Sequence, residues 1–156
     1  EQIGLGALKY FLLKVDPKRR MMFDPEESIE LEGNTAPFLQ YSHARASSIV
    51  KRANELGKSF EVDTAISLHP TEQAVISMLY DYPEKIAQAG SEYSPSIIAQ
   101  YTYDLTKAYN RFFHDVQIFS DNDERNVSMR VTLSKAVKDT IKSSLGLLGI
   151  EAPNRM

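Results

Sequence analysis

The sequence contains no cysteine among its 156 residues. This excludes disulfides, thiolate metal ligands and thiol nucleophiles. No apolar run approaches the ~20 residues that a membrane-spanning helix needs, and no signal-peptide pattern opens the chain. We therefore expect a cytoplasmic protein without a membrane partner. Its length suits one packed domain, or one domain with a remnant of another.

Motifs of catalysis are absent too. Gly4-x-Gly6 lacks the third glycine and the preceding strand of a dinucleotide-binding loop, and no Walker pattern occurs. The histidines, His43, His69 and His114, lie far apart without metal-ligand spacing. We predict that each is a helix cap, a surface residue or a hydrogen-bonded core group. The sequence therefore predicts no catalytic residue, no metal site and no cofactor in this chain.

The chain is acidic overall, with a net charge of −3 and a pI of about 5.6. Because nucleic-acid-binding domains are more often basic, this balance slightly favours another class, a helical module that binds a partner protein. A small basic stripe could still attract a phosphate backbone, since electrostatic attraction extends over roughly 8–10 Å in physiological salt. Net charge alone therefore leaves both classes of binding module open.

Proline, glycine and capping residues divide the sequence into helices, with a short strand possible at 21–23. Helices are predicted at 3–15, 35–56 and 70–80, between Pro83 and Gly90, from Pro95 to about Phe112, and from a capping box at 121–124 to about 148. The best defined is 35–56, where Thr35 can cap the first turn and Gly57 can adopt the left-handed conformation after the last turn. The pattern predicts an all-α helical bundle.

Apolar residues at helical spacing predict the core. The predicted core faces are Leu39, Ala46, Ile49, Val50, Ala53 and Leu56; then Ile97, Tyr101, Leu105, Ala108 and Phe112; and finally Leu133, Val137, Ile141, Leu145 and Leu148. The aromatic cluster Tyr109, Phe112 and Phe113 is also expected to be core.

A second face of the 35–56 helix carries side chains suited to RNA. Phe38, Tyr41, Arg45, Ser48 and Arg52 recur at intervals of three and four residues, beside the core face. Aromatic rings stack on unpaired bases, and arginine stacks or pairs with phosphate. The same spacing also suits rings that pack on a neighbouring helix beside solvated arginines, and spacing alone favours this structural alternative.

The segment 32–45, EGNTAPFLQYSHAR, resembles a motif of arginyl-tRNA synthetases at the start of their anticodon-binding domain. That motif usually reads EGNT, Gly or Ala, Pro-Tyr, an apolar residue and QYA, with an arginine a few residues on. Segment 3–10 resembles the stretch after the signature loop of the catalytic domain, and 109–113 resembles an asparagine–aromatic pair. Segment 146–156, GLLGIEAPNRM, resembles the terminal pattern of the family, which ends in Arg-Met. The matches cover nearly the whole chain in the family's order.

The resemblance implies an all-helical domain of the DALR anticodon-binding type, although the tetrapeptide Asp-Ala-Leu-Arg does not occur here. Residues 1–33 would be the C-terminal tail of the catalytic domain with a connector, and 34–156 the anticodon-binding domain. Since the chain starts at Glu1 rather than Met, just before a predicted helix, we expect the C-terminal fragment of a class I arginine–tRNA ligase. It would bind tRNA(Arg) rather than DNA. Its other partner would be the missing catalytic domain, which uses ATP, so the fragment alone is expected to be inactive.

Family positions near the anticodon correspond to Phe38, Tyr41, Arg45, Phe113 and Met156. At Phe38 and Phe113 the family often has tyrosine, so stacking is retained here while the hydroxyl hydrogen bond is lost. The apolar segment 147–150 is expected to anchor the C-terminus on the bundle and so to hold Arg155 and Met156 in place.

Overall fold

The computed structural model describes residues 2–20, 22 and 24–156, and the described chain contains helices but no strand. The helices are α1 (Gln2–Leu13), α2 (Pro25–Ser28), α3 (Ala36–Glu55), α4 (Pro70–Tyr80), α5 (Tyr82–Ser91), α6 (Pro95–Asp115) and α7 (Glu124–Leu147). The predicted all-α bundle is therefore confirmed. The strand suggested at 21–23 rests on residues 21 and 23, which lie outside the described residues.

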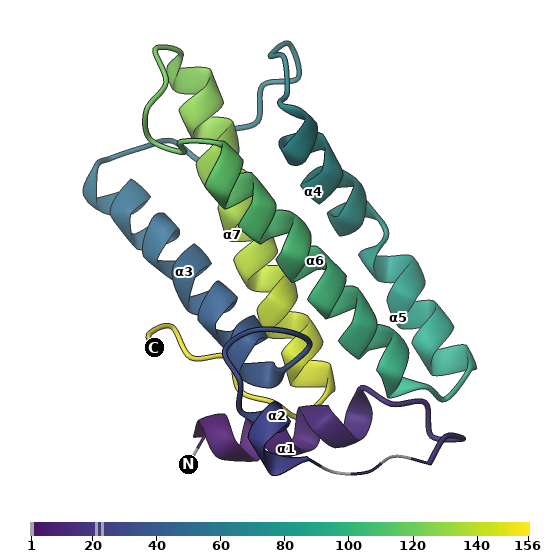
Figure 1. The fold of residues 1–156 in the computed structure, drawn as a ribbon. Helices are drawn as coiled ribbons and strands as arrows, with labels where there is room; N and C mark the ends of the chain where they lie inside the picture. Colours follow the sequence, from purple (N-terminus) through teal and green to yellow (C-terminus); the bar gives the residue numbers. More distant parts are fainter. Residues whose placement is uncertain (1, 21, 23) are drawn as a thin grey trace.

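Three long helices, α3, α6 and α7, run side by side, and α4 and α5 follow one another along the outer side of α6 (Figure 1). Helices α1 and α2 lie across one end of this bundle, while the loops 56–69 and 116–123 lie at the opposite end. The residues after α7 return beside α3. This last arrangement matters for function, because it brings the final residues of the chain onto the surface of α3.

Local capping explains most helix boundaries. Thr35 Oγ1 accepts a hydrogen bond from the N–H of Phe38 at 3.3 Å, and Gly57 follows α3 with φ of +64°. α7 begins later than the capping box at 121–124 predicts, because Asp123 rather than Asp121 caps it, accepting from the N–H of Arg125 at 3.0 Å. Asp121 instead accepts from the N–H of Asp123 at 2.9 Å and pairs with an arginine of α7.

The predicted core faces are largely buried. All the residues predicted for α7 are buried, as are Leu39, Ala46 and Ala53 on α3. The prediction was wrong for Leu56, which is 52% exposed. Leu56 is the C-cap of α3, where the chain turns away from the bundle, so helical periodicity no longer applies to it.

The aromatic cluster near the end of α6 is divided between core and surface. Tyr109 and Phe112 are buried, with ring centroids 5.8 Å apart. Phe113 was also predicted to be core, but it is 36% exposed. Successive residues of a helix point about 100° apart, so the residue after Phe112 faces away from the core.

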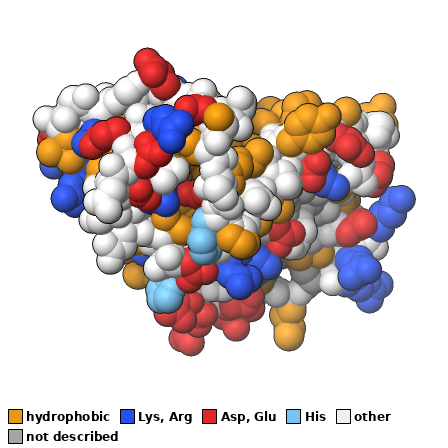
Figure 2. Space-filling model, turned by 90° about the horizontal axis from the view of Figure 1, so that it is seen from above, with side chains coloured by type: hydrophobic (Ala, Val, Ile, Leu, Met, Phe, Trp, Pro, Cys, Tyr) orange, Lys and Arg blue, Asp and Glu red, His pale blue; other side chains and the backbone are white. Residues whose placement is uncertain are grey.

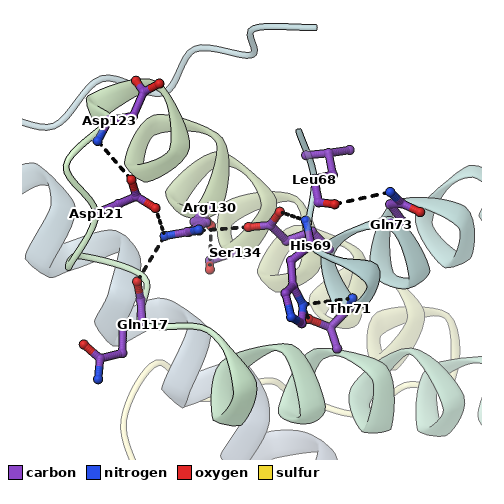
Figure 3. Close-up of polar contacts among 10 residues, drawn as sticks. Leu68, His69, Thr71, Gln73, Gln117, Asp121, Asp123, Arg130 and Ser134 are labelled. Carbon is purple, nitrogen blue, oxygen red and sulfur yellow. Dashed lines mark hydrogen bonds and ion pairs between the residues drawn. The ribbon is translucent and has the colours of Figure 1, made fainter. Parts of the chain in front are cut away.

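An ion-pair network fastens α4 to α7 at the loop end of the bundle (Figure 3). Arg130 Nε donates to Glu72 Oε1 at 2.8 Å, and Arg130 Nη1 lies 2.9 Å from Asp121 Oδ2 and donates to the Gln117 carbonyl at 3.3 Å. Glu72 Oε2 also accepts from the N–H of His69 at 2.7 Å. The Arg130 and Glu72 side chains are only 13% and 4% exposed, so removing either one would leave the other as a buried, unpaired charge.

Candidate nucleic-acid interface

Arg45 lies at the surface between two aromatic rings. Its guanidinium carbon is 5.0 Å from the ring centre of Tyr41 and 4.7 Å from that of Phe113. Arg45 Nη1 donates to Asn110 Oδ1 at 2.8 Å, and Asn110 Nδ2 donates in turn to Ser42 Oγ at 3.0 Å. We call Tyr41, Arg45, Asn110 and Phe113 the arginine clamp. Because guanidinium carries several N–H donors, the clamp orients Arg45 and leaves donors for a ligand.

The helices place the clamp by simple periodicity. Tyr41 and Arg45 are one turn apart on α3, so they share a face. Asn110 and Phe113 are three residues apart on α6 and also share a face. Since α3 and α6 pack side by side, these two faces meet at the surface beside the core.

A hollow of about 510 Å³ opens next to the clamp. It is lined by Tyr41, Ala44, Arg45, Ser48, Ile49, Phe113, Arg155 and Met156. Tyr41, Phe113 and Met156 are 43%, 36% and 46% exposed, so apolar surface is presented to solvent beside the guanidinium. We call this the aromatic hollow. The structure thus brings together Tyr41, Arg45, Phe113 and Met156, which come from separate segments of the chain.

Phe38 does not line the aromatic hollow. Its ring meets the ring of Tyr103 edge-on, with centroids 5.8 Å apart and planes at 62°, and it packs against the core. For Phe38 the structure therefore shows the packing arrangement that the sequence left as an alternative. Arg52, the last member of the predicted stripe, lies over the ring of Phe119 at 4.9 Å.

Apolar residues fix the start of the C-terminal segment, residues 148–156. Leu148 and Ile150 are buried, and Gly149 between them has φ of +67°, which lets the chain reverse after α7. Leu147 was expected to anchor this segment as well, but it is 57% exposed because it belongs to the outer side of the last turn of α7.

Polar contacts then hold the C-terminal segment along α3. Gln40 Nε2 donates to the Glu151 carbonyl at 2.8 Å, and His43 Nδ1 lies 2.8 Å from the Pro153 carbonyl. Burial lowers the pKa of His43, so its ring is neutral and Nδ1–H donates to Pro153. These contacts deliver Met156 to the aromatic hollow.

The three histidines have structural surroundings of the kinds predicted. His43 is a buried core group, His69 caps α4 and His114 is an exposed residue beside Asp115. Over the described part of the chain, no group of three or more His, Asp or Glu side chains could hold a metal ion. In the same residues, no helix combines the length and apolar character needed to cross a membrane.

Two members of this site were not among the predicted anticodon-binding residues, although the C-terminal anchor was expected to hold one of them, Arg155, in place. Asn110 orients Arg45, and its position three residues before Phe113 was a signal that could have identified it. Arg155 also lines the aromatic hollow. No local pattern could have placed Arg155 there, because its position depends on the path of the C-terminal segment over α3.

An all-α bundle with an oriented surface arginine, exposed rings and an open hollow defines the class of this protein as a helical binding module. Residues 39–156 match the family model described as the DALR anticodon binding domain, and the chain belongs to this family.

The chain is similar to two bacterial arginine–tRNA ligases. It is 51% identical to that of Flavobacterium psychrophilum, covering 99% of this chain and 25% of the relative. It is 47% identical to that of Phocaeicola vulgatus, covering 99% of this chain and 26% of the relative. Among solved structures, Thermus thermophilus arginyl-tRNA synthetase matches with a TM-score of 0.89 and 31% identity, covering 99% of this chain and 27% of that protein. The chain thus spans about a quarter of the length of these relatives.

Proposed function

We propose that this chain binds the anticodon arm of tRNA(Arg) as the C-terminal domain of an arginine–tRNA ligase. The observation that carries the proposal is the arginine clamp at the edge of the aromatic hollow, in a chain of the DALR anticodon-binding family. Membership of the family supports the class of ligand, and similarity to arginine–tRNA ligases supports the particular tRNA.

Each part of the site has a distinct role in this proposal. An unpaired base enters the aromatic hollow and stacks on Tyr41 or Phe113, an interaction worth about 1–3 kcal/mol per base. Arg45 donates hydrogen bonds to the base edge or to a phosphate, and Asn110 keeps its guanidinium in the required plane. Met156 packs its polarisable thioether on a base face. None of these steps is catalytic, so the clamp contributes affinity and discrimination only.

We propose further that residues 1–33 form the tail of the catalytic domain and that α1 is the contact surface for the rest of that domain. α1 buries Tyr10, whose hydroxyl donates to the carbonyl of Ala99 on α6 at 3.0 Å, so this side is fixed to the bundle. Its other side exposes the apolar side chains Leu5, Leu8 and Leu12. The ligation of arginine to tRNA with ATP belongs to the missing domain, and a cytoplasmic location is part of the same proposal.

The proposal is tested by titrating the 156-residue chain with tRNA(Arg) and with the same tRNA carrying another anticodon. We expect tighter binding of the arginine anticodon, because the aromatic hollow takes unpaired bases. Equal affinity for both tRNAs would refute anticodon recognition. No binding to either would favour the alternative class, a helical module for a partner protein.

A further inference from the structure

A second, larger hollow continues from the aromatic hollow along α3. Its volume is about 790 Å³, and it shares Ser48 and Arg155 with the aromatic hollow. α3, α7 and the C-terminal segment all contribute to its lining. We call it the α3–α7 groove. Because Arg155 borders both hollows, a ligand strand could pass from one to the other without leaving the protein surface.

The groove is strongly basic. Its lining includes the four cations Lys51, Arg52, Lys138 and Arg155 and the single carboxylate Glu55, which gives a net charge of +3. The whole chain has a net charge of −3. The groove therefore concentrates positive charge on an otherwise acidic protein.

The adjoining aromatic hollow is also basic, with Arg45 and Arg155 in its lining, but two hollows elsewhere on the molecule do not share this charge. The hollow formed by 61–64 and 124–128 has three carboxylates and one arginine, a net charge of −2. The hollow between the loop after α1, α5 and α6 has three cations and three carboxylates, a net charge of zero. At the loop end of the bundle, acidic and basic side chains are interspersed (Figure 2). The basic character of the groove is thus a local feature.

The cations of the groove are available to a ligand. Within the described chain neither Arg52 nor Arg155 forms an ion pair with a carboxylate, and Arg52 is instead held over the ring of Phe119 at 4.9 Å. Lys51 Nζ lies 3.7 Å from Glu55, in a pair whose side chains are both more than half exposed. Lys138 Nζ lies 3.3 Å from Asp139, and the two side chains are 23% and 49% exposed. Ion pairs that are open to solvent in this way are weak and rearrange easily when a phosphate approaches.

We propose that the α3–α7 groove binds the phosphate backbone of the RNA strand whose base occupies the aromatic hollow. This inference rests on the proposed function and assigns affinity and specificity to two different parts of the site. Phosphate contacts set affinity and register, while base contacts set specificity. An acidic chain can bind a polyanion in this way, because attraction to the groove acts within roughly 8–10 Å and distant carboxylates are screened.

The test is the salt dependence of tRNA binding by the variants Arg52→Gln and Lys138→Gln. Each variant removes one phosphate contact, so the slope of log K against log salt should fall in magnitude by about 0.7. Extrapolated from 1 M to 0.1 M salt, this slope corresponds to about fivefold weaker binding. The loss should be equal for tRNA(Arg) and for the tRNA with another anticodon, so the ratio of affinities stays unchanged.

Three further variants sharpen the comparison. Lys85→Gln makes the same chemical change on α5, away from the groove, and should leave the slope unchanged. Arg52→Lys keeps the charge and should retain the slope. Tyr41→Leu, in the aromatic hollow, should reduce the ratio of affinities and leave the slope intact. Thermal melts of each variant establish that binding is compared between folded proteins.

The outcomes separate the two proposals. If the parent chain discriminates between anticodons but the groove variants keep its salt slope, the groove inference is overturned and the proposed function stands. If Lys85→Gln lowers the slope as much as the groove variants do, attraction is diffuse and the groove inference is again overturned. If the parent chain binds neither tRNA, both proposals are overturned.

Discussion

Replacing Arg45 by alanine should weaken tRNA binding and also lower the stability of the bundle. In the structure Arg45 contacts the rings of Tyr41 and Phe113 and donates to Asn110. Each cation–π contact at an exposed site is worth about 0.5–1 kcal/mol, and a hydrogen bond to a charged group about 1.5–3 kcal/mol. Partial exposure reduces this total, so we expect Arg45→Ala to cost about 2 kcal/mol of unfolding free energy. For a chain of this size that loss lowers the melting temperature by about 4–8 °C.

The effect of Arg45→Ala on tRNA binding should be separate from its effect on stability. A lost charged hydrogen bond to RNA would weaken binding about ten- to hundredfold. Arg45→Lys distinguishes the two functions of the side chain, since lysine keeps the charge but loses the planar fork that stacks on a ring and orients on Asn110. We expect Arg45→Lys to retain most of the salt dependence of binding and to lose much of the discrimination between anticodons.

The assay is fluorescence anisotropy with labelled tRNA at 20 °C, combined with thermal melts of every variant. Arg111→Ala is the matched control, because Arg111 is exposed on α6 and points about 200° away from Phe113 around that helix. Arg111→Ala should change neither the affinity for tRNA nor the melting temperature appreciably. If Arg45→Ala binds tRNA as tightly as the parent but melts much lower, Arg45 is a structural residue and the reasoning about the clamp is wrong.

Three other predictions follow from named contacts. Arg130→Met should destabilise the chain by about 3–5 kcal/mol in urea denaturation, because it leaves the buried carboxylate of Glu72 without its cation. Adding Glu72→Gln should recover part of the lost stability. A cost below about 1 kcal/mol would contradict this account. Burial lowers the pKa of His43, so as pH falls the unfolded chain takes up a proton on this ring before the folded chain does. The free energy of unfolding is therefore unaffected by this group above about pH 6.5 and decreases as pH falls below it. Between pH 7.5 and pH 5.5, the melting temperature of His43→Gln should therefore fall less than that of the parent. Equal decreases in melting temperature would contradict this role of His43. Deleting Arg155 and Met156 should weaken tRNA binding at unchanged thermal stability, whereas equal affinity would exclude these residues from the site.

Much of the fold could be predicted from local chemistry. The prediction of a helix at 70–80 agrees with α4, and that at 35–56 differs from α3 by one residue at each end. Proline, a capping side chain and a following glycine act within a few residues, so their effects can be read without a tertiary structure. The start of α7 was predicted too early: Asp121 accepts from the N–H of Asp123 and pairs with Arg130, and Asp123 caps α7 instead.

The candidate site shows the same division. The sequence by itself determined that aromatic and basic side chains share one face of α3, because helical periodicity depends only on spacing along the chain. It could not decide that Phe38 packs on Tyr103 while Tyr41 stays exposed beside Arg45, since both satisfy the same spacing. Only the tertiary structure brought Asn110, Arg155 and Met156 to that face, because their positions depend on how α6 and the C-terminal segment pack against α3. Such long-range packing is decided by the complementarity of whole surfaces, which no short stretch of sequence contains.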